Sequence, residues 1–128
     1  MPADADDLAA AAREYGRLLP DPLDVVLLGM GEDGHTASLF PGSPALEERR
    51  ERVVAVEGPK PPPLRLTVTP PVIEGARDVL VLVSGAGKAV ALARALEGPV
   101  DPRALPVQLA RERTWIVDVA AAGRLASR

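Results

Sequence analysis

Residues 24–44 of this chain of 128 residues read DVVLLGMGEDGHTASLFPGSP, an apolar strand pattern that runs directly into a glycine-rich turn. The first part, Val25 to Leu28, contains four consecutive apolar residues, of which two are β-branched. An unbroken apolar run is typical of a parallel strand that is covered on both faces, whereas alternation marks a strand with one exposed face. We therefore expect a buried parallel strand at residues 24–29.

The turn that follows this strand has the composition of a ligand-binding loop. Gly29, Gly31 and Gly34 lie within six residues and let the backbone turn sharply and approach a ligand closely. His35, the only histidine of the chain, comes next, and Asp33 lies two residues before it. In open α/β sheets, ligands bind outside the carboxyl ends of the strands. We therefore expect a functional site at this end of the strand.

Apolar periodicity and the proline and glycine breaks predict the other elements. We expect helices at 4–19, 70–75, 88–96, 102–110 and 119–127, helical turns at 35–39 and 44–52, and strands at 53–56, 64–69, 78–84 and 114–118. Strands that alternate with helices indicate a three-layer α/β fold with a mainly parallel sheet flanked by helices. The sequence contains no repeat and no linker, which favours a single domain over residues 1–128.

Composition excludes several classes of function. The net charge of -3 argues against a general nucleic-acid-binding protein, which usually needs a basic face. The absence of cysteine excludes disulfides and thiolate metal sites, and a single histidine with ungrouped carboxylates predicts no metal and no cofactor. The acidic start, MPADADDLAA, lacks the pattern of a signal peptide, and the apolar runs are too short to span a bilayer. We expect a cytoplasmic protein without a membrane partner.

Three segments carry a family resemblance. GMGEDGHTASLFPGS, at residues 29–43, closely resembles the signature of the 6-phosphogluconolactonases, the lactone hydrolases of the oxidative pentose phosphate pathway. PKPPPLRLT, at 59–67, resembles the KPPPxR segment of that family, and GAGK, at 85–88, resembles its GxxK turn. The resemblance covers nearly the whole chain but only the C-terminal half of the family domain. We expect the N-terminal half, which has its own glycine-rich phosphate loop, to be missing here.

The resemblance implies a Rossmann-like fold and a reaction. The expected activity is hydrolysis of 6-phospho-D-glucono-1,5-lactone to 6-phosphogluconate, with His35 as the general base on water and Asp33 orienting its ring. A histidine suits this step because imidazole can accept a proton at neutral pH. Arg65 and Lys88 are implied contacts to the phosphate, and Gly31 and Gly34 are implied to line the substrate site. Backbone amides at the start of a helix after the turn could stabilise the oxyanion.

Each of these residues also has a purely structural interpretation. His35 could cap the helix that is expected after the glycine turn. Lys88 could be a surface lysine at a glycine turn, and Arg65 could equally pair with one of the many carboxylates of the chain. The family motif favours the catalytic interpretation of His35, while the role of Arg65 stays open.

Two other activities fit part of the pattern. Residues 29–34 satisfy G-x-G-x-x-G after a strand, with Glu57 about twenty residues further on, which is the arrangement of a dinucleotide-binding domain. That arrangement needs a full helix after the third glycine, and Pro41-Gly42 would end such a helix early. The related glucosamine-6-phosphate deaminases share the DGH turn, but they place a glutamate at the position of Phe40, which cannot act with the histidine in the same way.

A third alternative is a non-catalytic fragment or one half of a split enzyme. If helices of the missing half normally cover the apolar strands, one edge or face of the sheet is left uncovered in this chain. We therefore expect the chain to self-associate or to bind a partner chain that carries the other half.

Overall fold

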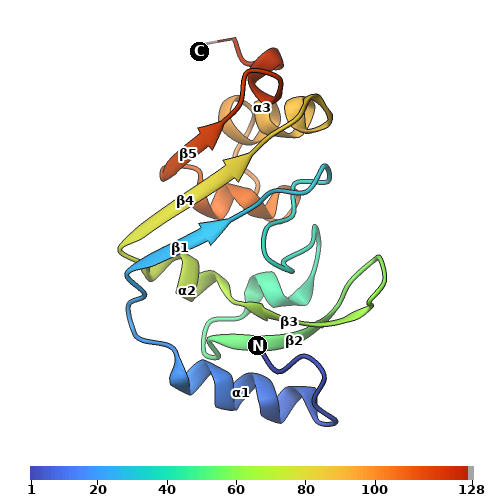
Figure 1. Cartoon of the computed structure of the whole chain (residues 1–128), viewed down its shortest axis with the longest axis vertical. Coiled ribbons are helices and arrows are strands. Elements are labelled where there is room, and N and C mark those ends of the chain that lie inside the picture. Colours follow the sequence, from blue (N-terminus) through green and yellow to red (C-terminus); the bar gives the residue numbers. More distant parts are fainter. Residues whose placement is uncertain (127–128) are drawn as a thin grey trace.

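The computed structural model describes residues 1–126, in which a parallel three-stranded sheet lies beside a separate antiparallel pair of strands (Figure 1). The parallel sheet has the order β1 (Val25–Leu28), β4 (Asp78–Val83), β5 (Thr114–Val117). The register pairs Val25 with Asp78, and Leu80 with Thr114. The predicted mixed α/β fold with a parallel sheet and flanking helices is confirmed.

Seven helical segments accompany the strands in the described part of the chain. They are α1 (Leu8–Leu18), η1 (Pro44–Glu47), α2 (Pro70–Gly75), η2 (Ala86–Lys88), α3 (Ala89–Glu97), η3 (Pro106–Ala110) and η4 (Ala121–Arg124), where η denotes a 3₁₀ helix. None of the helices in residues 1–126 has the length and apolar character needed to cross a membrane.

Helix boundaries differ from the sequence prediction where local capping decides them. α1 begins at Leu8 rather than residue 4, because the side chain of Asp7 accepts a hydrogen bond from the Ala10 amide at 3.0 Å and forms the N-cap. α2 spans the predicted residues and begins with proline, which suits the first helical turn. The helix predicted at 119–127 is reduced to η4, and position 127 lies outside the described residues.

The main core lies on one face of the parallel sheet. Val26 and Val81 point into it from two neighbouring strands. Ile73 from α2, Leu92 from α3 and Val107 from η3 pack in the same cluster, and none of these three side chains is exposed. Burial of such aliphatic side chains is the main stabilising term for this part of the chain.

The opposite face of the same sheet is open. Val25, Leu27, Leu82 and Ile116 are 53%, 66%, 48% and 52% exposed. The expectation of a strand covered on both faces is therefore wrong for the described residues, whereas the expectation of an uncovered face is confirmed. The reason is topological: both parallel connections step in the same direction, from β1 to β4 to β5, and right-handed crossovers then place their helices on the same face.

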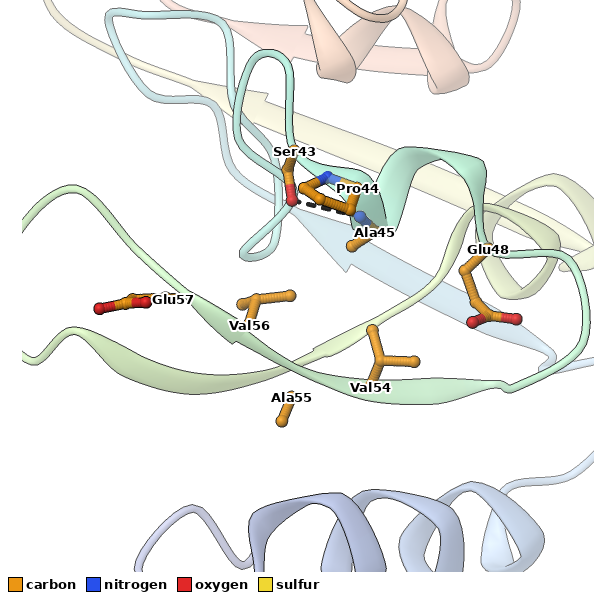
Figure 2. A pocket seen from close by; sticks show the side chains of 8 residues that line it. All are labelled: Ser43, Pro44, Ala45, Glu48, Val54, Ala55, Val56 and Glu57. Carbon is orange, nitrogen blue, oxygen red and sulfur yellow. Dashed lines mark hydrogen bonds between the residues drawn. The ribbon is translucent and has the colours of Figure 1, made fainter.

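The antiparallel pair β2 (Val53–Glu57) and β3 (Leu64–Val68) forms a second, smaller layer against α1. Ala12, Val53 and Leu66 form its buried centre. On the other side, a groove of about 530 Å³ separates β2 from η1. Figure 2 shows Val54 and Val56 pointing into this groove and Ala55 pointing towards α1. The groove contains none of the residues implied for the lactonase site, although Glu57 of the dinucleotide alternative lines it.

Candidate active site

The turn after β1 is closed by its own backbone. The Gly31 amide donates to the His35 carbonyl at 2.9 Å, and the Gly34 amide donates to the Gly31 carbonyl at 2.9 Å. Gly34 has φ +87°, a conformation that glycine adopts without strain. A side chain at this position would also meet Leu105, because a Cβ would lie 2.4 Å from its Cδ2 atom. Gly34 therefore shapes the turn, and it is not among the residues that line the cavity described below; its predicted contact with the substrate stays a prediction.

The helical turn predicted at residues 35–39 does not form. Thr36 and Leu39 instead form an isolated antiparallel bridge, and Ala37 adopts φ 49° between them. The Thr36 hydroxyl donates to the Gly29 carbonyl at 2.8 Å, and the Ser38 amide donates to the Thr67 hydroxyl at 3.1 Å. These contacts hold a compact turn, so the helix amides that were expected to stabilise an oxyanion are absent from this position. Because a turn replaces the helix here, the dinucleotide-binding alternative also lacks the helix that it requires.

His35 and Asp33 form a contact pair within the turn. Asp33 Oδ1 lies 2.5 Å from Nδ1 of His35 and accepts the backbone amide of His35 at 3.0 Å. Gly31 lies directly against the ring, because a Cβ at this position would be 2.1 Å from Nδ1. Nε2 of His35 has no hydrogen-bond partner within residues 1–126, and the His35 side chain is 31% exposed.

The environment of Asp33 favours its ionised form. Burial raises the pKa of this carboxyl group, but the backbone amide and the ring of His35 outweigh burial and hold the pKa below its ordinary value. An ionised carboxylate can only accept hydrogen bonds, so Nδ1 of His35 must carry the hydrogen between them. The arrangement thereby leaves Nε2 unprotonated in the neutral ring, which is the state that a general base needs.

Lys88 reaches the same turn from the next strand of the sheet. Its Nζ atom donates to the Met30 carbonyl at 2.6 Å. Gly85, with φ +96°, opens the turn that carries the lysine, and its amide donates to both carboxylate oxygens of Asp118 at 3.1 Å. Asp118 also accepts the Ala121 amide at 2.8 Å. Sequence reasoning missed Asp118, although an acidic residue directly after the last strand could have been noticed as a candidate for this edge.

Arg65 is held by the proline-rich hairpin. Its Nε atom donates to the Pro62 carbonyl at 3.0 Å, and an Nη atom donates to the Lys60 carbonyl at 3.2 Å. The guanidinium lies over the Phe40 ring, with Cζ 5.4 Å from the ring centroid. Within residues 1–126 Arg65 forms no ion pair with a carboxylate, so the structural alternative for this residue is not supported.

These side chains surround one cavity of about 490 Å³. Its lining joins the predicted residues Gly31, Asp33, His35, Arg65 and Lys88 with four that were not predicted, namely Glu32, Phe40, Pro59 and Lys60. Lys60 lies in the same segment, residues 59–67, that carries Arg65. Its place in that segment could have identified it as a candidate. The cavity therefore has an imidazole–carboxylate pair and three cationic side chains around one space.

Comparison with known sequences agrees with the geometry. A family described as "Glucosamine-6-phosphate isomerases/6-phosphogluconolactonase" matches residues 1–118. The chain is similar to the 6-phosphogluconolactonase of Mycobacterium tuberculosis, with 48% identity over 94% of this chain and 54% of that protein. It is also similar to that of Homo sapiens, with 42% identity over 92% of this chain and 48% of that protein. The chain spans about half the length of the curated relatives that it matches.

Solved structures with these two activities also superpose on the chain. The 6-phosphogluconolactonase of Trypanosoma brucei superposes with a TM-score of 0.76 and 33% identity, over 98% of this chain and 58% of that chain. The enzyme of the same name from Trypanosoma cruzi superposes with a TM-score of 0.79 and 29% identity, over 98% and 55%. A monomeric glucosamine-6-phosphate deaminase also superposes, with a TM-score of 0.76 and 26% identity, over 94% and 56%.

Proposed function

Because the chain belongs to the glucosamine-6-phosphate isomerase/6-phosphogluconolactonase family, we propose that it carries the hydrolytic site for 6-phospho-D-glucono-1,5-lactone. The observation that carries this proposal is the contact between Asp33 and Nδ1 of His35 at the edge of a cavity lined by cations. Such a pair provides a base, and the cations suit a substrate that bears a phosphate.

In the proposed reaction His35 first acts as a base. Nε2 takes a proton from water while the water oxygen bonds to the lactone carbonyl carbon, and the carbonyl electrons move to its oxygen. Asp33 stabilises the imidazolium that results, as the third member of a catalytic triad does. When the tetrahedral intermediate collapses, the bond between this carbon and the ring oxygen breaks. The ring oxygen takes the proton from Nε2, which gives the open-chain acid and restores neutral His35.

The three cations of the cavity are proposed to bind the phosphate. Lys88 is fixed beside the turn of His35, whereas Lys60 and Arg65 come from the hairpin on another side of the cavity. The hairpin engages the Nε hydrogen and one Nη hydrogen of Arg65, which leaves the other Nη hydrogens as donors for an anion. Charge-assisted hydrogen bonds to a phosphate are about twice as strong as neutral ones.

The second reaction of the family, conversion of an amino sugar phosphate, fits this cavity less well. The side chain next to the His35 ring is Phe40, at 4.8 Å between ring centroids, and it has no ionisable group for a second proton transfer. A lactone needs only one proton carrier, because the proton that leaves water returns to the ring oxygen. This difference favours hydrolysis.

The open face of the parallel sheet bears on whether the chain acts alone. Parallel sheets are almost always covered on both faces. We propose that this face binds a polypeptide with the sequence of the part of the family domain that lies outside the match, supported by four exposed aliphatic side chains and by the greater length of the relatives. The cytoplasmic location expected from composition stays a prediction.

A lactonase assay tests the proposal directly. Turnover of the phosphorylated lactone is measured by the release of acid, corrected for spontaneous hydrolysis, with the purified chain alone and after addition of the corresponding remainder of the Mycobacterium tuberculosis relative. Catalysis in either mixture that depends on His35 supports the proposal. Hydrolysis at the spontaneous rate in both mixtures contradicts it.

A further inference from the structure

Phe40 lies between the two chemical ends of the cavity. Its ring centroid is 4.8 Å from that of His35, with 44° between the ring planes. The guanidinium carbon of Arg65 lies 5.4 Å from the centroid of the same Phe40 ring. The Phe40 residue is 8% exposed. One buried aromatic ring thus contacts both the proposed base and a proposed phosphate ligand.

The chain places Phe40 there by a tight turn. Leu39 is fully buried in the main core, and its amide donates to the Thr36 carbonyl at 2.9 Å. The next residue therefore leaves the core and faces the cavity. The Phe40 carbonyl then accepts the Ser43 amide at 3.0 Å, which fixes the backbone on the other side of the ring.

The packing around the ring leaves little free space. A Cβ at Gly58 would lie 3.1 Å from Cε2 of Phe40 and 3.0 Å from Nε of Arg65. Gly31 also packs against the imidazole, because a Cβ there would lie 2.1 Å from Nδ1 of His35. The imidazole therefore has Asp33 at Nδ1, Gly31 against the ring and Phe40 as a further neighbour. A displacement of the Phe40 ring would remove one contact of His35 and one of Arg65, whereas Arg65 keeps its hydrogen bonds to the Pro62 and Lys60 carbonyls.

Phe40 also separates the active-site cavity from a neighbouring one. A second cavity of about 540 Å³ is lined by Phe40, Asp33 and Pro59 together with residues 41–44 and 57–58. Because Phe40 lines both spaces, its ring forms part of the wall between them. Loss of the ring would join the two cavities beside the Asp33–His35 pair.

We propose that Phe40 is a positioning residue of the lactonase site. It holds the His35 ring with Nε2 towards the substrate and sets the distance from that base to Arg65. Its π face is compatible with positive charge on both neighbours, because an aromatic face attracts cations. This inference rests on the proposed function for its kinetic part, whereas its structural part concerns the orientation of His35 alone.

The test replaces the ring and observes the only histidine of the chain. In Phe40→Leu, ¹⁵N NMR of the imidazole reports the tautomer of His35, and kinetics report kcat and KM. We expect the parent to have its hydrogen on Nδ1 and the variant to populate both tautomers. We expect kcat to fall about a hundredfold, the cost of a misplaced catalytic group, with KM changed by less than about threefold. Tyr15→Leu is the matched control, because Tyr15 packs against Ala12, Val53 and Leu66 and lies outside the cavity.

Two further measurements keep the outcome decisive. If Trp115 fluorescence shows that Phe40→Leu is unfolded, Phe40→Met replaces it, since methionine fills the space with a flexible apolar chain and no ring. A parent-like tautomer and parent-like kcat in the folded variant overturn the inference. If the parent has no lactonase activity either alone or with the added remainder of the relative, the proposed function fails, and the tautomer comparison alone still decides whether Phe40 positions His35.

Discussion

The ammonium of Lys88 donates a hydrogen bond to the carbonyl of Met30 at 2.6 Å, so the turn after β4 is joined to the turn after β1. The two residues are far apart in sequence, but parallel strands bring their carboxyl ends to the same edge of the sheet. One side of the cavity therefore depends on a contact between a side chain and a main-chain atom. Substitutions at Lys88 are expected to change both binding and geometry.

Replacement of His35 tests the base. We expect His35→Asn and His35→Ala to lower kcat by about two to four powers of ten, because general base catalysis is lost while the core is untouched. Steady-state kinetics give the change in kcat, and the fluorescence of Trp115 checks that the variants are folded. Parent-like turnover in a folded variant would remove His35 from the mechanism.

Replacement of Lys88 tests phosphate binding. Lys88→Ala should raise KM for the phosphorylated lactone far more than for an unphosphorylated sugar lactone, because the lost cation is proposed to pair with the phosphate. Arg94→Ala is the control, since Arg94 is an exposed cation on α3 outside the cavity. Lys88→Arg separates charge from the contact with Met30. Equal losses on both substrates would mean that Lys88 acts through the geometry of the turn.

Two glycines of the same motif should respond differently to alanine. In Gly31→Ala the new Cβ would lie 2.1 Å from Nδ1 of His35 and 2.7 Å from Oδ1 of Asp33, so the pair must move. We expect about a hundredfold loss of kcat, the cost of misplacing a catalytic group by about 1 Å. Gly29→Ala should stay close to the parent, because a Cβ there has no atom within 4 Å. Similar kcat values for both variants would show that the turn adapts.

The lowered pKa of Asp33 predicts a pH dependence of stability. A carboxyl group whose folded-state pKa lies below its unfolded-state pKa stabilises the fold above the unfolded value, and this contribution is lost as pH falls through the folded value. Urea unfolding of the parent and of Asp33→Asn should therefore differ at neutral pH and converge only below about pH 4. A constant difference from pH 7 to pH 3 would contradict the assignment.

The open sheet face predicts an association. With the remainder of the Mycobacterium tuberculosis relative added, sedimentation equilibrium should show a one-to-one complex, because the complex covers Val25, Leu27, Leu82 and Ile116. Leu27→Glu should weaken it, whereas Leu18→Glu should not, since Leu18 is 74% exposed on α1. Two results would contradict the proposal that this polypeptide covers the open face. One is a chain that stays monomeric when the polypeptide is added, and the other is a self-associated chain that does not bind it.

The sequence predicted the features that depend on local patterns. The apolar run of β1, the proline at the start of α2 and the glycine turns near His35 and Lys88 each have a local physical cause, and the structure contains all of them. The roles of His35 and Lys88 came from the family motif and stay predictions, although both side chains line the cavity.

Features that depend on distant residues could not be predicted in this way. The turn at Thr36 to Leu39 replaces a helix because Ser38 binds Thr67, far along the chain. The anchoring of Gly85 by Asp118 depends on the pairing of β4 with β5. The sequence could not show which face of the sheet is open, because both faces of the strands carry aliphatic residues. The pattern therefore does not distinguish a covered face from an exposed one.

The position of β1 has a consequence for how the protein fails. Within residues 1–126, β1 pairs only with β4, so this strand of four residues has a hydrogen-bonded neighbour on one side alone. The turn with Asp33 and His35 follows the carboxyl end of this edge strand. Local opening is easiest where the fewest backbone hydrogen bonds must break. The turn is nevertheless tied to η3, because the Val107 amide donates to the Gly34 carbonyl at 2.9 Å, so opening of β1 is expected to disturb His35 only once this contact with the core also loosens.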